Sequence, residues 1–127
     1  LVLHWKRSNS TELHLALVTS KPGWAALGWS VGGKMAGSDA VIGNTDGAKP
    51  IQAYRLESLS MEGVKPTDTF SLGNKTSVTA GNSGSTVIAF SRMEGTGVVP
   101  VKLSGPSSMI FSSSQDGSKT LAYHGPA

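Results

Sequence analysis

The apolar residues of this chain occur in short alternating runs, separated by turn-forming residues about every 8–12 positions. Leu13, Leu15 and Leu17 alternate with His14 and Ala16, and the stretch 51–56 repeats this alternation. A period of two is typical of half-buried β-strands, and no segment shows the period of about 3.6 residues that an amphipathic helix requires. The pattern therefore predicts an all-β protein, built as a sandwich or a barrel.

Strands are predicted at residues 13–17, 24–31, 40–42, 51–56, 85–92, 98–103 and 108–112, and the chain begins in a further strand-like run. Pro100 interrupts one of them, which suggests an edge strand or a bulge. Residues 73–84 are rich in glycine, serine and asparagine, and this composition predicts a hairpin connection or a loop. The 127 residues suffice for one domain with its own core. Both ends look cut, so we expect this single domain, residues 1–127, to be a module of a longer protein.

Composition excludes several classes of function. The chain has no cysteine, which rules out disulfides, thiolate-held zinc and iron–sulfur clusters. The formal net charge is +3, but the basic residues are scattered, and Lys6-Arg7 is the only adjacent pair. Nucleic-acid binding requires a clustered basic face, so we do not expect it. No apolar run approaches the roughly 20 residues of a membrane-spanning helix.

Other candidate sites are weaker. Ser83 lies between glycines, as in some serine hydrolases, but the surrounding sequence is neither a nucleophile elbow nor compatible with a two-barrel protease. The glycines near residues 28–33 do not form a phosphate-binding motif. His4 and His14 lie on strand-like runs, where a surface or cross-strand role is the simpler interpretation. A zinc site built from the three histidines of the chain stays open, although their spacing does not call for one.

Met35 and His124 are the most informative pair. Met35 lies in a glycine-rich stretch, whereas His124 lies near the C-terminal end in the sequence Leu-Ala-Tyr-His-Gly. A thioether and an imidazole can together hold a low-spin haem iron from its two faces. From residue types alone, other roles for a loop methionine and a terminal histidine stay open.

The order of residues around Met35 carries a family resemblance. Residues 23–30 read Gly-Trp-Ala-Ala-Leu-Gly-Trp-Ser, Met35 follows in a short loop, and residues 37–43 read Gly-Ser-Asp-Ala-Val-Ile-Gly. This order resembles the DOMON domain family, which includes the cytochrome domain of cellobiose dehydrogenase. Phe90-Ser91-Arg92 resembles the aromatic-x-Arg strand of that family, and residues 116–125 resemble its last strand with the ligand histidine. The resemblance covers essentially the whole chain.

The resemblance implies an immunoglobulin-like antiparallel β-sandwich of two sheets. It also implies a b-type haem, bound without covalent attachment, with Met35 and His124 as the axial ligands of the iron. We expect Trp29 among the apolar walls of the haem pocket, and Lys34, Arg92 and Tyr123 as partners of the haem propionates. Because both axial positions would be filled, electron transfer is favoured over catalysis by the domain itself, and enzymatic activity stays an open question.

The family also sets expectations about context. The resemblance implies an extracellular or cell-surface location and a redox partner, such as a flavoprotein or a transmembrane cytochrome. Membrane association would come only through the parent protein. Asn9 and Asn74 begin sequences that permit N-glycosylation in a secreted chain. The alternative is a haem-free DOMON module that binds sugar or a protein partner in an adhesion or structural role.

Overall fold

The computed structural model describes residues 1–7, 11–45, 50–58, 60–80, 84–103 and 106–114. Within these ranges the chain forms nine β-strands and one short 3-10 turn, η1. The elements are β1 (Val2–Arg7), β2 (Glu12–Thr19), β3 (Trp24–Ser30), β4 (Ser38–Asn44), β5 (Ile51–Leu56), η1 (Met61–Gly63), β6 (Val64–Pro66), β7 (Ser77–Ala80), β8 (Thr86–Met93) and β9 (Ser108–Ser113).

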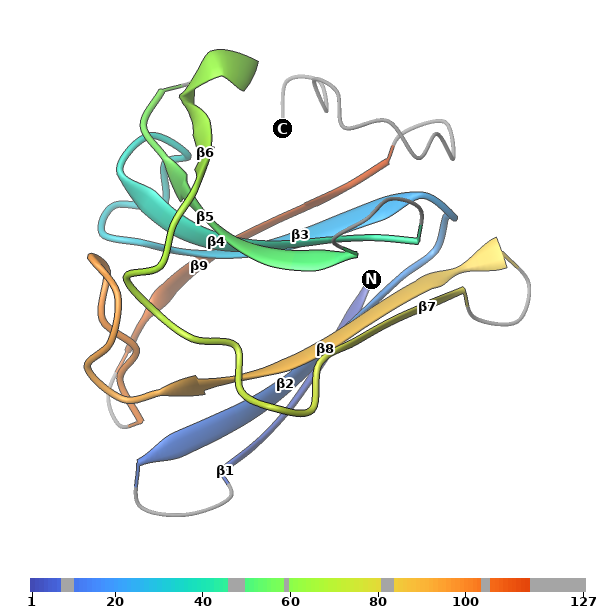
Figure 1. Ribbon diagram of the computed structural model, residues 1–127, viewed down its shortest axis with the longest axis horizontal. Coiled ribbons are helices and arrows are strands. Elements are labelled where there is room, and N and C mark those ends of the chain that lie inside the picture. The colour runs from blue at the N-terminus through green and yellow to red at the C-terminus, as the bar shows by residue number, and fades with distance from the viewer. Residues whose placement is uncertain (8–10, 46–49, 59, 81–83, 104–105, 115–127) are drawn as a thin grey trace.

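The strands form two antiparallel sheets that pack face to face (Figure 1). Sheet A has the order β1-β2-β8-β7, and sheet B has the order β6-β5-β4-β3-β9. The chain crosses from one sheet to the other after β2, after β6 and after β8. The predicted all-β class and the two-sheet antiparallel sandwich are therefore confirmed, and the barrel alternative is wrong.

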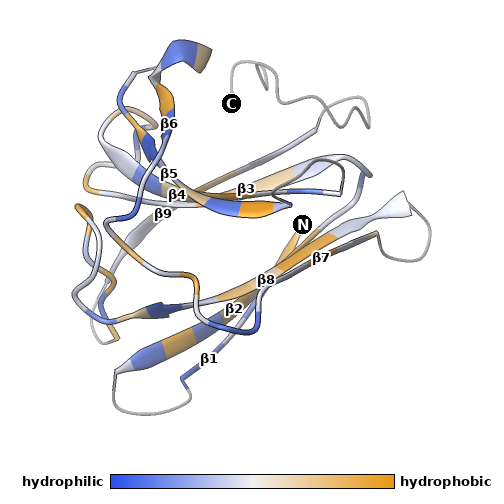
Figure 2. Cartoon of the chain, viewed as in Figure 1, coloured by the Kyte–Doolittle hydropathy of each residue, from blue (hydrophilic) through white to orange (hydrophobic). Residues whose placement is uncertain are grey.

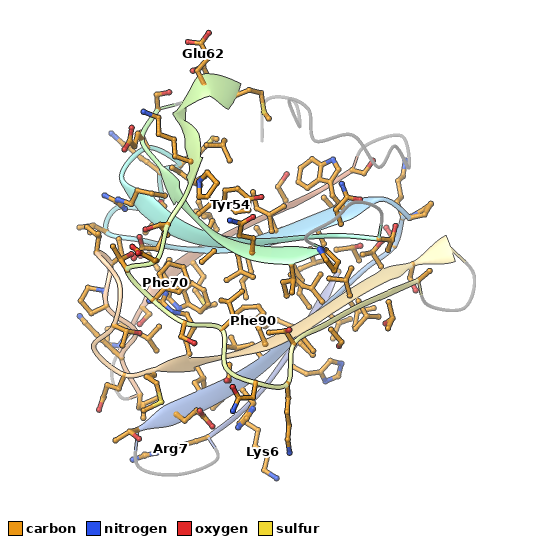
Figure 3. All side chains as sticks on the ribbon, in the orientation of Figure 1. Lys6, Arg7, Tyr54, Glu62, Phe70 and Phe90 are labelled. Carbon is orange, nitrogen blue, oxygen red and sulfur yellow. The ribbon has the colours of Figure 1, made fainter. Side chains whose placement is uncertain are left out.

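The core fills the space between the inner faces of the two sheets. Alternation along β2 turns Leu15 and Leu17 inward, and β8 contributes Ile88 and Phe90. Figure 2 shows the resulting apolar and polar alternation along β2, and Figure 3 shows Phe90 pointing between the sheets. Burial of such side chains stabilises each by about 1.5–3 kcal/mol relative to exposure, which makes this alternation the main determinant of the fold.

Gly43 lies where the two sheets approach each other closely. It is on the inner side of β4, and a Cβ atom at this position would overlap the side chain of Ile88. A glycine in a strand interior often marks such a close approach of two layers. Gly43 therefore helps set the spacing between sheet A and sheet B.

Three parts of the predicted strand pattern differ from the structure, one of them the short strand β6, which was not predicted. Residues 98–103 were expected to form a strand, but they form turns, because Pro100 has no amide donor and positive φ angles at Gly95 and Gly97 bend the chain beforehand. The segment nevertheless buries Val99 and Val101 in the core. Strand β7 lies within the region predicted as a connection, since its polar sequence gives little strand signal.

Candidate functional site

Met35 lies in the loop of residues 31–37, which joins β3 to β4 at one end of sheet B. The backbone of the neighbouring Lys34 is held by two serines. The Ser30 hydroxyl donates to the Lys34 carbonyl at 2.8 Å and accepts from its amide at 2.9 Å. The Ser38 hydroxyl donates to the same carbonyl at 2.6 Å. These bonds fix the residue next to Met35 on the ends of both flanking strands.

The loop lies against the outer side of sheet B. Ser30 and Ser38 point outward, because the adjacent Trp29 and Asp39 point inward, and both serines are buried. The Gly37 amide donates to the Leu56 carbonyl of β5 at 2.7 Å, and the Ser38 amide donates to the Met35 carbonyl at 3.2 Å. Met35 is consequently half-buried at the margin of the outer face, whereas Lys34 is exposed.

The outer face of sheet B, from this loop to the far end of β3, is largely apolar. Gly28 faces Ala40 on one side and Ile110 on the other, and Ala40 faces Tyr54. The absence of a side chain at Gly28 gives room to Ile110, whose Cγ1 would be 2.8 Å from a Cβ atom there. We call this surface the outer apolar patch. Its members face outward and are buried or half-buried: Trp24, Ala26, Gly28, Ala40, Ile42, Tyr54, Leu56 and Ile110.

Tyr54 brings a polar group to this patch. Its hydroxyl lies 3.5 Å from Gln52 Oε1, and Figure 3 shows the residue on the side of sheet B that faces away from sheet A. Partial burial raises the pKa of Tyr54 above its ordinary value, because the phenolate is poorly solvated there. The phenol therefore stays protonated and can serve as a donor at neutral pH.

A buried cation lies on the inner side of the same end of sheet B. Arg92 is 1% exposed, and its Cζ lies 4.5 Å from the ring centroid of Trp29 and 4.0 Å from that of Phe70. Its Nη2 donates to the Thr96 carbonyl at 2.6 Å. Burial lowers the pKa of Arg92 to about 10, and the charge of Asp39 partly opposes this effect. The guanidinium thus contacts two aromatic rings and donates a hydrogen bond to a backbone carbonyl.

Asp39 connects this interior region to the Met35 loop. Its Oδ2 accepts the Val99 amide at 2.6 Å, and its Oδ1 accepts Arg55 Nη1 at 3.3 Å. Arg55 Nη1 also donates to the Gly37 carbonyl at 2.8 Å. Asp39 therefore has a structural role, and its amide partner lies 60 positions away in the chain.

The structure brings together some of the predicted site residues. Lys34 and Met35 are neighbours in the loop, as the sequence requires. Trp29 was expected as a pocket wall and Arg92 as a propionate partner, and both lie together in the interior, on the inner side of sheet B. His124 and Tyr123 lie outside the described residues, as do Asn9 and Ser83. Asn74 is exposed just ahead of β7.

Sequence reasoning missed the residues that position the loop. Ser30 and Ser38 end and begin the strands on either side of Met35, and both fall on the outer-face phase of the alternation. Their outward position in the strand alternation could have predicted this role, because a serine hydroxyl beside a tight loop often bonds to the loop backbone. The contact of Gly37 with Leu56 depends on strand order, which the sequence did not reveal.

No metal cluster of the usual protein type appears in the described ranges. No group of three or more histidine, aspartate or glutamate side chains lies close enough there to hold a metal ion. In the same ranges, no helix is long and apolar enough to cross a membrane.

Comparison with known proteins identifies the family. No curated protein and no solved structure matches the chain. Residues 1–114, however, match the family model of the DOMON domain. This match covers every strand of both sheets and the Met35 loop. The chain therefore belongs to the DOMON domain family.

Proposed function

We propose that this DOMON domain binds a b-type haem without covalent attachment and transfers electrons, with Met35 and His124 as axial ligands. The observation that carries the proposal is a half-buried methionine whose loop is tied down at the margin of an apolar surface. Methionine usually fills gaps in a core, where no such set of backbone contacts is needed. A fixed loop reduces the entropy that a thioether loses on binding a ligand.

The surroundings of Met35 fit the chemistry of a haem. The outer apolar patch supplies apolar walls, with the short side chain of Ala40 in its middle and Ile110 filling the space over Gly28. Lys34 is exposed beside Met35 and is suited to pair with a propionate. Trp29 and Arg92 lie together on the inner side of the sheet, whereas the outer apolar patch lies on its other side.

The chain length allows His124 to approach Met35. The Ser114 amide donates to the Trp24 carbonyl at 3.0 Å, so Ser114 lies at the end of β3 opposite the Met35 loop. The six residue steps from Trp24 to Ser30 span about 20 Å. His124 follows Ser114 by ten residue steps, and an extended chain of that length reaches about 33–36 Å. The reach exceeds the required distance, and it also allows Tyr123 to meet a propionate.

The axial ligands determine what chemistry follows. When bound, the haem would supply a one-electron redox centre. A thioether and an imidazole from the chain would fill both axial positions, which disfavours direct reaction with substrate or oxygen. Thioether ligation also favours the ferrous state. We therefore propose an electron-transfer role for an extracellular or cell-surface domain, with a redox protein or fused redox domain as its partner.

Visible absorption spectra before and after dithionite reduction, with hemin titrated into the purified domain, test the proposal. We expect the sharp reduced α-band of a low-spin haem. Met35→Ala should keep the fold but shift the iron toward a high-spin or water-ligated state, and His124→Ala should lose most of the haem. Met93→Ala, at the end of β8, and His4→Ala, on β1, are matched controls that should keep the parental spectrum.

Two results would count against the proposal. An unaltered low-spin spectrum in both Met35→Ala and His124→Ala would show that the ligands are wrong. No low-spin band in the parent domain at saturating hemin would remove the cytochrome role. The domain would then be a haem-free module, and the outer apolar patch would be the surface on which to test sugar or protein ligands.

A further inference from the structure

The outer face of sheet A carries a second candidate site, far from the Met35 loop in the fold. A hollow of about 300 Å³ opens there, with Ala16 and Ala89 on its floor. Its rim carries four basic or imidazole side chains, from His4, Lys6, His14 and Lys75. We call this surface the basic hollow.

Strand register explains why these residues meet. His4 faces Ala16 across β1 and β2, and Ala16 faces Ala89 across β2 and β8. Lys6 faces His14 in the adjacent row. Alternation places these side chains outward, because their sequence neighbours, such as Leu15, pack into the core. Figure 3 shows Lys6 extending away from the sandwich. Two alanines surrounded by longer side chains leave the floor low, which creates the hollow.

The segment that precedes β7 forms the side of the basic hollow that carries Lys75. The Ser91 amide donates to the Leu72 carbonyl at 2.9 Å, which holds this segment against β8. Gly73 has a φ of 79°, and a Cβ atom there would overlap the Ser91 hydroxyl, so the segment passes close above the strand. Lys75 follows two residues later and completes the rim. These contacts hold the segment that carries Lys75 close to β8.

The charge of the basic hollow is positive. Lys6 and Lys75 each contribute one charge, and the imidazoles of His4 and His14 add hydrogen-bond donors. Glu12 is the acidic neighbour on β2, and its Oε1 lies 3.0 Å from His14 Nε2. This contact orients the imidazole and leaves the two lysines as the dominant charges. Two lysines and two imidazoles around an apolar floor suit a small molecule that carries several oxyanion groups on a short apolar body.

We propose that the basic hollow binds a small organic polyanion, through charge pairing with Lys6 and Lys75 and hydrogen bonds from His4 and His14. The site lies on sheet A, whereas the outer apolar patch lies on sheet B, so the two proposals are independent of each other. A volume of about 300 Å³ is at the lower end of small-molecule pockets and exceeds what one inorganic oxyanion fills.

Calorimetric titration of the full 127-residue chain with citrate at low ionic strength tests the proposal. Lys6→Gln with Lys75→Gln should weaken citrate binding at least about tenfold, since two charged contacts are lost. Lys65→Gln with Lys102→Gln removes the same total charge outside the hollow and should change the affinity less than about twofold. Equal weakening by both pairs would show that only net charge matters, which would overturn the proposal.

Filling the hollow gives a second test that leaves the charge unchanged. Ala16→Met should reduce citrate affinity by a similar factor, because the larger side chain occupies the floor. Far-ultraviolet circular dichroism and the thermal midpoint establish that each variant folds. Undiminished citrate binding to folded Ala16→Met would overturn the proposal. Sulfate and phosphate serve as comparison ligands in the same titration. If both bind more weakly than citrate, the ligand is an organic polyanion; if either binds as tightly as citrate, this choice of ligand is overturned.

Discussion

Replacing Asp39 by asparagine tests whether the buried charges beside the Met35 loop stabilise this end of the sandwich. Asparagine has nearly the same shape, and its amide oxygen can still accept the Val99 amide, which lies 2.6 Å from Asp39 Oδ2. The substitution therefore removes the negative charge and replaces the oxygen that accepts Arg55 Nη1 by an amide nitrogen, which cannot accept. Two cations lose their counter-charge: the fully buried Arg92 and the partly buried Arg55.

The expected cost follows from the burial of Arg92. Its pKa lies at about 10 rather than 12.5, even though Asp39 raises it. That difference corresponds to about 3 kcal/mol by which the folded surroundings, with Asp39 included, disfavour the charged form of Arg92. Removing one partner from a buried set of charges costs about 3–5 kcal/mol. We therefore expect Asp39→Asn to lower the free energy of unfolding by about 3 kcal/mol.

A second substitution shows whether the charge of Arg92 is the reason. Arg92→Met keeps an apolar stem between Trp29 and Phe70 but removes the cation, so Asp39→Asn should then cost only about 1 kcal/mol in the Arg92→Met background. Urea denaturation measures all four proteins of this cycle. With a slope of about 1–3 kcal/mol per molar urea, a 3 kcal/mol loss moves the midpoint by about 1–3 M. A cost of Asp39→Asn that is the same in both backgrounds would refute the reasoning.

Three further predictions use the same denaturation assay or simple spectroscopy. Gly43→Ala should lower the free energy of unfolding by about 1–3 kcal/mol, because the new methyl group overlaps Ile88. Gly32→Ala is the control: a Cβ there meets no atom within 4 Å, so it should change stability by less than about 0.5 kcal/mol. The raised pKa of Tyr54 means that the folded state favours the neutral phenol, a contribution to the free energy of unfolding that is complete below pH 10.0 and is lost as the pH rises through the folded-state pKa. Tyr54→Phe should therefore lose less stability at alkaline pH than the parent protein. In an absorbance titration, the phenolate signal that rises above pH 10.0 in the native parent should be missing from the variant. Ser38→Ala removes the 2.6 Å hydrogen bond to the Lys34 carbonyl of the Met35 loop, and should lower the free energy of unfolding, measured by urea denaturation, by about 1 kcal/mol. In the hemin-loaded domain the same substitution should increase the high-spin fraction seen in the visible spectrum.

Local alternation was enough to predict most strands but not their neighbours in space. The strand 51–56 was predicted with the bounds that the structure shows, because its alternating run is flanked by turn residues. The polar strand β7 has no such alternation, and only its pairing with β8 reveals it. The expected strand at 98–103 is wrong, since Pro100 and the preceding turn prevent ladder pairing while apolar side chains still find the core.

The same limit applies to the candidate site. The loop position of Met35 and the exposure of Lys34 follow from neighbouring residues, and both were predictable. The burial of Arg92 was not, because the rings that enclose it come from β3 and from the segment before β7. From sequence alone, an arginine two positions after a strand phenylalanine is expected to be exposed, because arginine is rarely fully buried, and only the strand order shows which rings surround it.

The amide of Val99 has a consequence for how this domain opens. It lies in a turn, where backbone amides normally exchange with solvent water through small local motions. Here the Asp39 carboxylate accepts it at 2.6 Å, and Val99 is buried. Exposing this amide requires β4 and the turn to separate, which disrupts the core itself. Its hydrogen exchange should therefore be as slow as that of the central strands, and it should report global unfolding from outside the hydrogen-bonded ladders.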